Sequence, residues 1–298
     1  MIYDLIIIGA GAAGLTAALY AHRYNLKTLI ISKDLGGTAL EAHSIENFPG
    51  YKGISGIELM KQWINHIKSL KIEIQQEDVI NVEKQNDIFT ITTKDDKKFQ
   101  SKTVILALGM KRKHLNVEGE DKFLGKGVSY CAACDGPLFK DKTVVVIGGG
   151  DTALMDAQFL VNHAKKVYII HRRDDFRAEP KREEQIKKNK KIEIIYNANV
   201  KEIKGKDFVN SIILDNKTEL KVDGVFIDVG FIPSVNIIKK LKVKCDEHDY
   251  ITVNNKQETN IPGLFAAGDI TYNSLKQIIT AAAEGAIATF SAFKFNIK

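Results

Sequence analysis

The chain has 298 residues, 44% of them hydrophobic and 27% charged, a composition that excludes disorder and leaves room for two ordinary domains. Its formal net charge of +6 comes from lysines interleaved with acidic residues, which indicates a solvated basic surface rather than a nucleic-acid-binding stripe. Three cysteines are too few, and odd in number, for a secreted disulfide framework. The start of the chain lacks a basic leader, and no apolar run is expected to span a bilayer. The sequence therefore predicts a cytoplasmic protein that binds neither nucleic acid nor a membrane.

The first predicted unit is a strand, a glycine turn, a helix and a second strand. An apolar run over Tyr3–Ile8 predicts a buried parallel strand, helical periodicity covers Leu15–Tyr24, and a second strand covers 27–31. Between the first strand and the helix stands the run GAGAAG at 9–14. Its glycine spacing permits a tight turn, a close approach of the backbone to a pyrophosphate, and close packing of the helix on the strand. The free N–H groups of the helix start would bind the phosphates, so this turn predicts a dinucleotide site.

The acid that usually binds the ribose at the end of the second strand is displaced in this chain. Ser32 and Lys33 stand at that place, with Asp34 just beyond. The ribose contact is therefore expected from Asp34, from Ser32 or from backbone.

The same pattern returns in the second half of the chain. A β-branched strand at 143–147 precedes the turn GGGDTA at 148–153, a helix to about 162, and a strand at 166–170. The remaining predicted elements are a helix at 56–70, strands at 72–74, 79–99, 103–108, 192–195, 207–214 and 224–229, a Gly-Asp turn at 262–269, and a helix at 277–293. The chain is thus predicted to be an α/β protein with two Rossmann-like dinucleotide-binding domains.

A basic cluster closes the second unit. Its last strand runs into His171, Arg172 and Arg173, with Arg177 close behind, and no acid is placed to bind a ribose 2′-hydroxyl. Because guanidinium groups match a 2′-phosphate, this cluster predicts NADPH. Two nicotinamide sites would have nothing to exchange, so a flavin is expected in the first unit.

Cys131 and Cys134 form a C-x-x-C motif just before the second unit, and Asp135 follows. The spacing allows a redox disulfide at a helix start, with Asp135 as a proton shuttle or a capping residue. The motif could instead supply half of a zinc site completed by Cys245 and His248.

In six ordered blocks the chain resembles the low-molecular-weight thioredoxin reductases over nearly its full length. The blocks are residues 9–14, 45–50 (IENFPG), 131–136 (CAACDG), 148–153, 171–178 and 263–269 (GLFAAGD). The resemblance implies an FAD-binding domain from 1–112 and 241–298, and an NADPH-binding domain at 113–240 inserted into it. It also implies a homodimer whose two domains rotate relative to each other.

The resemblance assigns roles to named positions. Cys134 would face the flavin, Cys131 would attack the disulfide of a thioredoxin-like partner, and Asp135 would be the acid–base residue. The implied FAD contacts are Gly9, Gly11, Ala13, Gly14, Ser32, Gly36, Gly37, Thr38, Asn47, Gly109, Asp269, Lys276, Gln277 and Ile278. The implied NADPH contacts are Gly148, Gly150, Asp151, Thr152, Ala153, His171, Arg172, Arg173 and Arg177.

The chain departs from the family pattern at four positions. Thr38 replaces a usual Gln, Lys276 an Arg, Met155 a Glu and Phe231 a His. The expected activity is transfer of hydride from NADPH to FAD and on to the Cys131–Cys134 disulfide, then thiol–disulfide exchange with a thioredoxin-like or glutaredoxin-like protein. The alternatives are a flavin-dependent NADPH oxidase or ferredoxin–NADP reductase on the same fold, and a non-enzymatic NADPH or redox sensor.

Overall fold

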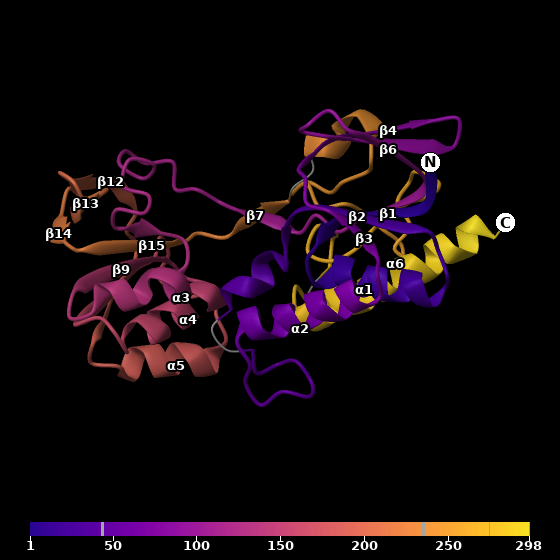
Figure 1. Cartoon of the computed structure of the whole chain (residues 1–298). Helices are drawn as coiled ribbons and strands as arrows, with labels where there is room; N and C mark the ends of the chain where they lie inside the picture. The colour runs from indigo at the N-terminus through magenta and orange to yellow at the C-terminus, as the bar shows by residue number, and fades with distance from the viewer. Residues whose placement is uncertain (43–44, 234–235, 274, 298) are drawn as a thin grey trace. The chain divides into compact units, whose positions relative to one another are not determined.

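A computed structural model describes residues 1–42, 45–233, 236–273 and 275–297. The chain forms two compact units, each with its own sheets and cores (Figure 1). Unit 1 consists of residues 1–111 and 232–298, and unit 2 of residues 112–231. The predicted α/β class with two Rossmann-like domains, one inserted into the other, is confirmed.

Unit 1 is built on a mixed sheet with the strand order β3-β2-β1-β6-β5-β4, and β17 also pairs with β6. The strands β1, β2, β3, β6 and β17 run parallel to one another. On its way to β4 the sheet turns antiparallel, since β5 pairs antiparallel with both β6 and β4. The strands are β1 Ile2–Ala10, β2 Thr28–Leu35, β3 Glu73–Gln75, β4 Val79–Gln85, β5 Ile88–Thr93, β6 Lys98–Leu106 and β17 Leu264–Ala266. The helices are α1 Ala12–Arg23, α2 Gly56–Ser69 and α6 Ile278–Asn296, with short 3-10 turns η1 Gly37–Glu41 and η3 Asn236–Leu241.

Strand β1 is buried on both faces, as its unbroken apolar run predicts. Leu5 and Ile7 point into one core, which α1, α2 and α6 cover. Ile6 and Ile8 point into a second core, which the meander and η3 cover. These two layers hold the carboxyl end of β1, where the first glycine turn lies, in a fixed place.

Helix α6 corrects one expectation. By length and composition its 19 residues could cross a membrane, although we expected no such run. Its small residues explain the apolarity in another way, because they pack on α1. The Thr289 hydroxyl donates to the Ala17 carbonyl (3.0 Å), and a side chain at Gly285 would collide with the Ala13 carbonyl.

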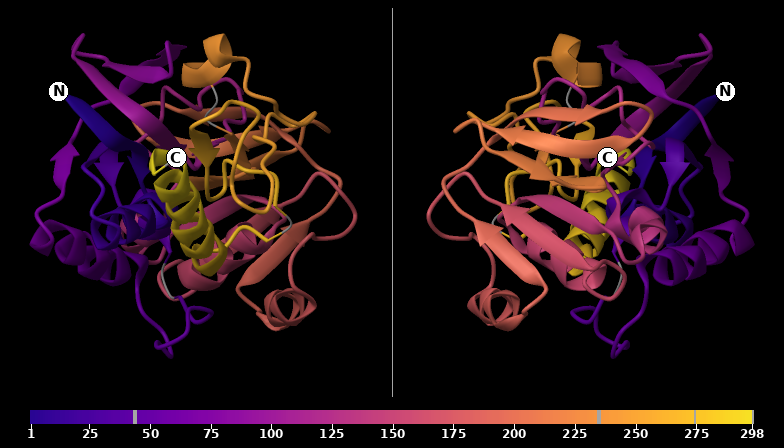
Figure 2. Two further views of the ribbon diagram at one scale, coloured as in Figure 1. Left: turned by 90° about the vertical axis from the view of Figure 1, so that its right-hand side faces the viewer. Right: turned by 90° about the vertical axis from the view of Figure 1, so that its left-hand side faces the viewer.

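Unit 2 is built on a parallel sheet with the order β11-β10-β9-β15-β8. Its strands are β8 Val128–Ser129, β9 Thr143–Gly148, β10 Lys166–Ile170, β11 Ile192–Ile195 and β15 Gly224–Asp228. Helices α3 Ala132–Asp135, α4 Asp151–Leu160 and α5 Pro180–Lys188, with η2 Gly136–Phe139, lie on one side of it. An antiparallel sheet of β12 Val200–Gly205, β13 Val209–Leu214 and β14 Glu219–Lys221 lies on the other (Figure 2).

Both chain crossings between the units are short strands, β7 Met110–Arg112 and β16 Phe231–Pro233, which pair with each other. The second crossing comes earlier than the domain bounds given above. Residues 232–240 fall in unit 1, because η3 packs against β4 and Ile238 is buried in the second core of that unit.

Candidate functional site

The first glycine turn has no room for larger residues. A Cβ on Gly14 would lie 1.9 Å from the Gly9 carbonyl oxygen, so α1 can rest on β1 only with glycine there. Gly11 is the N-cap of α1, and since it has no side chain, it leaves the amides of the first turn free for another acceptor. Gly37 approaches Gly11 so closely that a Cβ on it would lie 3.0 Å from the Gly11 Cα. Ala13 is buried behind this turn.

Ser32 is committed inside the protein. Its hydroxyl accepts from the Ala10 amide (3.1 Å) and donates to the Asp34 carbonyl (2.6 Å). This bridge fixes the end of β2 against the glycine turn, and the side chain is buried. Of the three expected sources of a ribose contact, the exposed Asp34 side chain and the neighbouring backbone are accessible to a ligand. The Ser32 hydroxyl supports the turn through these two bonds, and its expected contact with FAD stays a prediction.

The remaining predicted FAD residues come from three distant segments. Gly36 donates its amide to the Ala10 carbonyl (2.8 Å), and Thr38 is exposed in the 3-10 turn that follows. Asn47 donates to the Gln277 side chain (2.9 Å), although 230 residues separate the two. Gly109 has a φ of 58° and open space around it.

Asp269 lies in a turn that Glu284 and Lys276 hold in shape. The Glu284 carboxylate accepts from the amide of Gly268 (2.7 Å) and the hydroxyl of Thr271 (3.1 Å). Lys276 donates to the carbonyls of Asp269 and Thr271 (2.9 Å each). Burial raises the pKa of Asp269, Lys276 opposes the rise, and Glu284 adds to it. Burial lowers the pKa of Lys276. Lys276 therefore stabilises this turn through its two hydrogen bonds to backbone carbonyls. Ile278 is the first residue of helix α6.

The second glycine turn rests on a buried histidine. A Cβ on Gly149 would lie 2.2 Å from His171 Nδ1, so the ring directly supports the turn. Burial, with help from Arg173 and Arg172, lowers the pKa of His171, whereas a backbone hydrogen bond at Asp175 opposes the shift. His171 Nε2 is buried without a hydrogen-bond partner among the described residues. A neutral His171 thus positions the turn and is not placed as a surface cation.

The arginines lie around this turn. Arg172 and Arg177 are exposed and Arg173 is half-buried, and the Arg177 amide donates to the Gly149 carbonyl (2.7 Å). Gly148 and Gly150 frame the turn, and Asp151, exposed Thr152 and buried Ala153 open α4. The Asp151 carboxylate accepts from the Glu179 amide (2.9 Å) and from Arg182 Nε (3.3 Å). Arg182, on helix α5, was not among the predicted residues, and it holds the Asp151 carboxylate at the start of α4.

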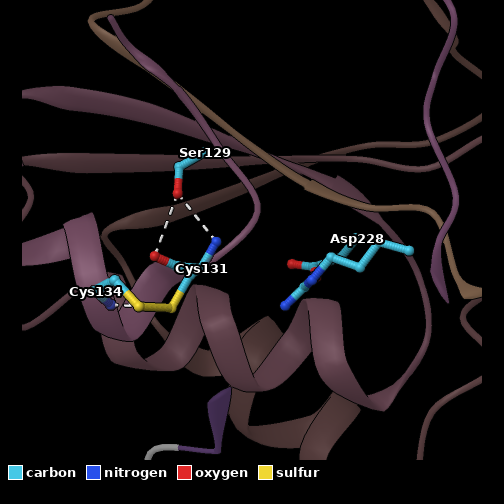
Figure 3. Close-up of a disulfide and its surroundings, with 5 residues drawn as sticks. Ser129, Cys131, Cys134 and Asp228 are labelled. Atoms are coloured by element: carbon cyan, nitrogen blue, oxygen red, sulfur yellow. Dashed lines mark hydrogen bonds and ion pairs between the residues drawn. A yellow bond between two sulfur atoms is a disulfide. The ribbon is translucent and has the colours of Figure 1, made fainter. Parts of the chain in front are cut away.

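Cys131 and Cys134 form a disulfide at the start of α3 (Figure 3). The Ser129 hydroxyl accepts from the Cys131 amide (3.0 Å) and reaches the Cys131 carbonyl (3.3 Å). The Cys134 amide donates to Cys131 Sγ (3.2 Å), and such a bond would favour a thiolate at Cys131. Cys134 is exposed, while Cys131 and Asp135 are half-buried. Ser129 is the last residue of β8, and no pattern in the sequence pointed to it.

The disulfide and the second glycine turn share one edge of the parallel sheet. Gly148 ends β9 and pairs with Asp228 at the end of β15. Phe226 pairs with Ser129 in β8, and the same register continued places Cys131 beside Asp228. The carboxyl edge of a parallel sheet is where ligands of this architecture bind.

A buried carboxylate orders the chain in front of the cysteines. Glu120 accepts from the Tyr130 hydroxyl and from the amides of Leu115 (3.0 Å), Asn116 (2.6 Å) and Val117 (3.4 Å). Burial alone would raise the pKa of Glu120, but these donors outweigh it and lower the pKa. Tyr130 directly precedes Cys131, so the carboxylate fixes the approach to the redox pair.

The zinc alternative finds no support. Cys131 and Cys134 are bonded to each other, and residues 1–42, 45–233, 236–273 and 275–297 contain no group of three or more metal-ligating side chains. Cys245 is half-buried, and burial, with Asp249 and Asp246, raises its pKa. Its thiol is therefore a poor nucleophile.

Comparison with known proteins agrees with this geometry. Residues 3–285 match the family described as pyridine nucleotide-disulphide oxidoreductase. The thioredoxin reductase of Treponema pallidum (strain Nichols) is 41% identical over 98% of this chain and 97% of its own length. That of Bacillus subtilis (strain 168) is 39% identical over 97% and 93%. The crystal structure of Lactococcus lactis thioredoxin reductase superposes with a TM-score of 0.94 at 37% identity, covering 99% of both chains.

The chain belongs to the low-molecular-weight thioredoxin reductases. It is an NADPH-dependent flavoprotein disulfide reductase whose cofactors are FAD and NADPH. The residues present fit both cofactors. Gly11 and Gly150 are the N-caps of α1 and α4 and make no side-chain cap. The space where their Cβ atoms would stand is open, with nothing nearer than the Gly37 Cα, 3.8 Å from the position at Gly11, and the second turn also lies beside three arginines.

Proposed function

We propose that this enzyme reduces the disulfide of a thioredoxin-like protein through Cys131 and Cys134. The observation that supports it most directly is the disulfide beside the arginine-flanked glycine turn, on one edge of a single parallel sheet. When bound, FAD accepts a hydride from NADPH and passes the electron pair to a disulfide.

The two cysteines take different roles. We assign the attacking thiolate to Cys131, because the Cys134 amide donates to its sulfur. Cys131 Sγ bonds to one sulfur of the partner's disulfide, and the other leaves as a thiolate that takes up a proton. Cys134 then attacks Cys131 Sγ, which restores the disulfide and releases the partner's second thiol. Asp135, half-buried at the end of α3, supplies and accepts the protons.

The cofactor contacts complete the proposal. In unit 1, FAD contacts the turn at 9–14, Gly36, Gly37, Thr38, Asn47, Gly109, Asp269, Gln277 and Ile278. In unit 2, NADPH contacts the turn at 148–153, and Arg172, Arg173 and Arg177 bind its 2′-phosphate. Ser32, Lys276 and His171 act by positioning these turns, as their internal hydrogen bonds and packing indicate.

The same proposal covers assembly and compartment. The family resemblance favours a cytoplasmic homodimer, and α6 carries exposed apolar side chains at Ile279, Ile287 and Phe290 that a second copy could cover. Sedimentation of Phe290→Glu tests this, and a wild-type monomer would contradict it.

The test begins with anaerobic titration by NADPH, which should bleach the flavin and yield two thiols per chain. Cys131→Ser and Cys134→Ser should each abolish turnover with a thioredoxin acceptor. With Cys131→Ser, the mixed intermediate should no longer form. NADH and reduced ferredoxin serve as comparison donors, and Arg177→Gln should narrow the preference for NADPH over NADH. Reduction of thioredoxin by Cys134→Ser at the wild-type rate would contradict the proposal.

A further inference from the structure

Three charged side chains meet at the buried edge of unit 2, between the glycine turn and the disulfide. Arg112 comes from the first crossing strand β7, Asp228 from the end of β15 and Asp156 from α4. Arg112 Nη1 donates to Asp228 Oδ1 (3.2 Å), and the Asp228 side chain is only 2% exposed. Asp156 is buried too, at 7%. Carboxylates this deep are retained only with partners that offset the cost of burial.

The group lies where the chain passes between the units. Unit 2 begins at Arg112 and ends at Phe231. Strand β7 pairs with β16, and the residue that follows β7, Lys113, donates its amide to the Gly230 carbonyl (2.9 Å). The two crossings are thus tied to each other, and Arg112 ties them both to β15.

We propose that Arg112, Asp228 and Asp156 form a clamp that fixes both chain crossings to the parallel sheet and so positions its carboxyl edge. The inference rests on the proposed function and on the domain rotation that the family resemblance implies, in which this edge presents NADPH at one stage and the disulfide at another. A firm attachment makes unit 2 move as one body, with bending confined to the steps outside Arg112 and Phe231. The three are positioning residues.

One proton belongs to the clamp. Burial raises the pKa of Asp228 well above its ordinary value, Asp156 adds to the rise, and Arg112 opposes it. The charged groups that shift the pKa of Asp228 come from α4 and β7. Strand β9 contributes the backbone of Gly148, and on the β8 side the continued register places Cys131 beside Asp228. With one proton held, one cation faces one anion. A carboxyl with a raised pKa in the closed form stabilises that form at low pH, and the stabilisation is lost as the pH rises through that pKa. The clamp should therefore loosen as the pH rises through the pKa of Asp228.

Amide hydrogen exchange of the holoenzyme measures the clamp directly. The peptides to follow cover 110–117 and 226–231, in a pH series from about 5 to about 9, corrected for intrinsic rates. In Arg112→Met these amides should exchange at least about tenfold faster, because a buried carboxylate loses its cation. Asp228→Asn mimics the protonated acid, so it should keep the protection and remove its pH dependence. Lys166→Met breaks an exposed ion pair with Glu193 in the same unit and should change nothing.

Turnover supplies a second reading. The wild-type rate should fall over the same pH interval in which the exchange accelerates, with an unchanged NADPH dissociation constant, and Asp228→Asn should flatten that fall. If Arg112→Met does not fold, Arg112→Lys, which keeps the charge but loses the fork, should give an intermediate exchange rate. The clamp would be refuted if both Arg112 variants exchanged these amides at the wild-type rate, or if Asp228→Asn exchanged them faster than the wild type. Failure of the proposed function would show separately, as wild-type enzyme that yields no thiols with NADPH.

Discussion

Glu120→Gln is the sharpest test of how the redox segment is held. The carboxylate accepts on both oxygens, from Leu115 and Tyr130 on one and from Asn116 and Val117 on the other. A glutamine has only one accepting atom, so at least one backbone amide loses its acceptor whichever way the amide group turns. The Tyr130 hydroxyl can rotate to accept, but a backbone amide cannot.

The magnitude follows from this count. A fully buried unsatisfied amide costs about 1–3 kcal/mol, and less is lost here because Leu115 and Val117 are half-buried and Asn116 is exposed. The bonds that remain also lose the strengthening that a charged acceptor gives. We expect the free energy of unfolding of unit 2 to fall by about 1–2 kcal/mol at neutral pH. Urea unfolding of the oxidised holoenzyme, followed by a probe in unit 2, measures it. Glu118→Gln makes the same chemical change at an exposed neighbour and should stay within about 0.5 kcal/mol of wild type.

The pH dependence adds a second criterion. The hydrogen bonds lower the folded pKa of Glu120 below its ordinary value. The stabilisation is therefore present above the unfolded pKa and disappears as the pH falls through the folded pKa. Glu120→Gln should remove this part of the acid sensitivity. Equal stability of Glu120→Gln and Glu118→Gln at neutral pH, with the wild-type acid slope intact, would refute the reasoning.

Three further substitutions test the cofactor turns. Gly14→Ala places a Cβ 1.9 Å from the Gly9 carbonyl oxygen, so purified protein should be folded by circular dichroism but should contain little FAD. Gly149→Ala pushes on the His171 ring (2.2 Å) and should weaken NADPH binding at least about tenfold in fluorescence titration, whereas unchanged affinity would contradict the support role. Lys276→Met leaves two carbonyls without their donor and should speed FAD release by about tenfold. Lys276→Arg should retain FAD almost as well as the wild type.

The sequence predicted what local pattern determines. Both βαβ units, the glycine turns and the parallel strands Thr143–Gly148 and Lys166–Ile170 followed from apolar runs and glycine spacing. Helix α5 was not foreseen, because a charged surface helix of nine residues leaves a weak apolar pattern. The apolarity of α6 was underestimated, since small residues that pack on α1 count as apolar in a helix of soluble proteins as well as in a membrane.

Roles within the site depended on contacts that no local pattern encodes. Asn47 and Gln277 could be named from the family resemblance, but their hydrogen bond joins segments 230 residues apart. Ser32 and Lys276 are expected to touch FAD, and the fold adds that their polar atoms also bond within the protein. The signal that distinguishes a ligand contact from a positioning residue is the direction of the side chain, which only the fold supplies. The Arg112, Asp156 and Asp228 group combines three elements and was invisible in sequence.

The order of the parallel strands bears on the catalytic cycle. Strand β15 separates β8, which leads to Cys131, from β9, which leads to the turn at Gly148. The two sites thus lie about 10 Å apart along this edge. The family resemblance implies that unit 2 rotates to present them to the flavin in turn. On that expectation, the stiffness of its crossings limits how precisely each site is presented. This requirement would explain why the chain keeps a carboxylate that costs free energy to bury. The proposed clamp between Asp228 and Arg112 places the flexible steps outside the sheet rather than within it.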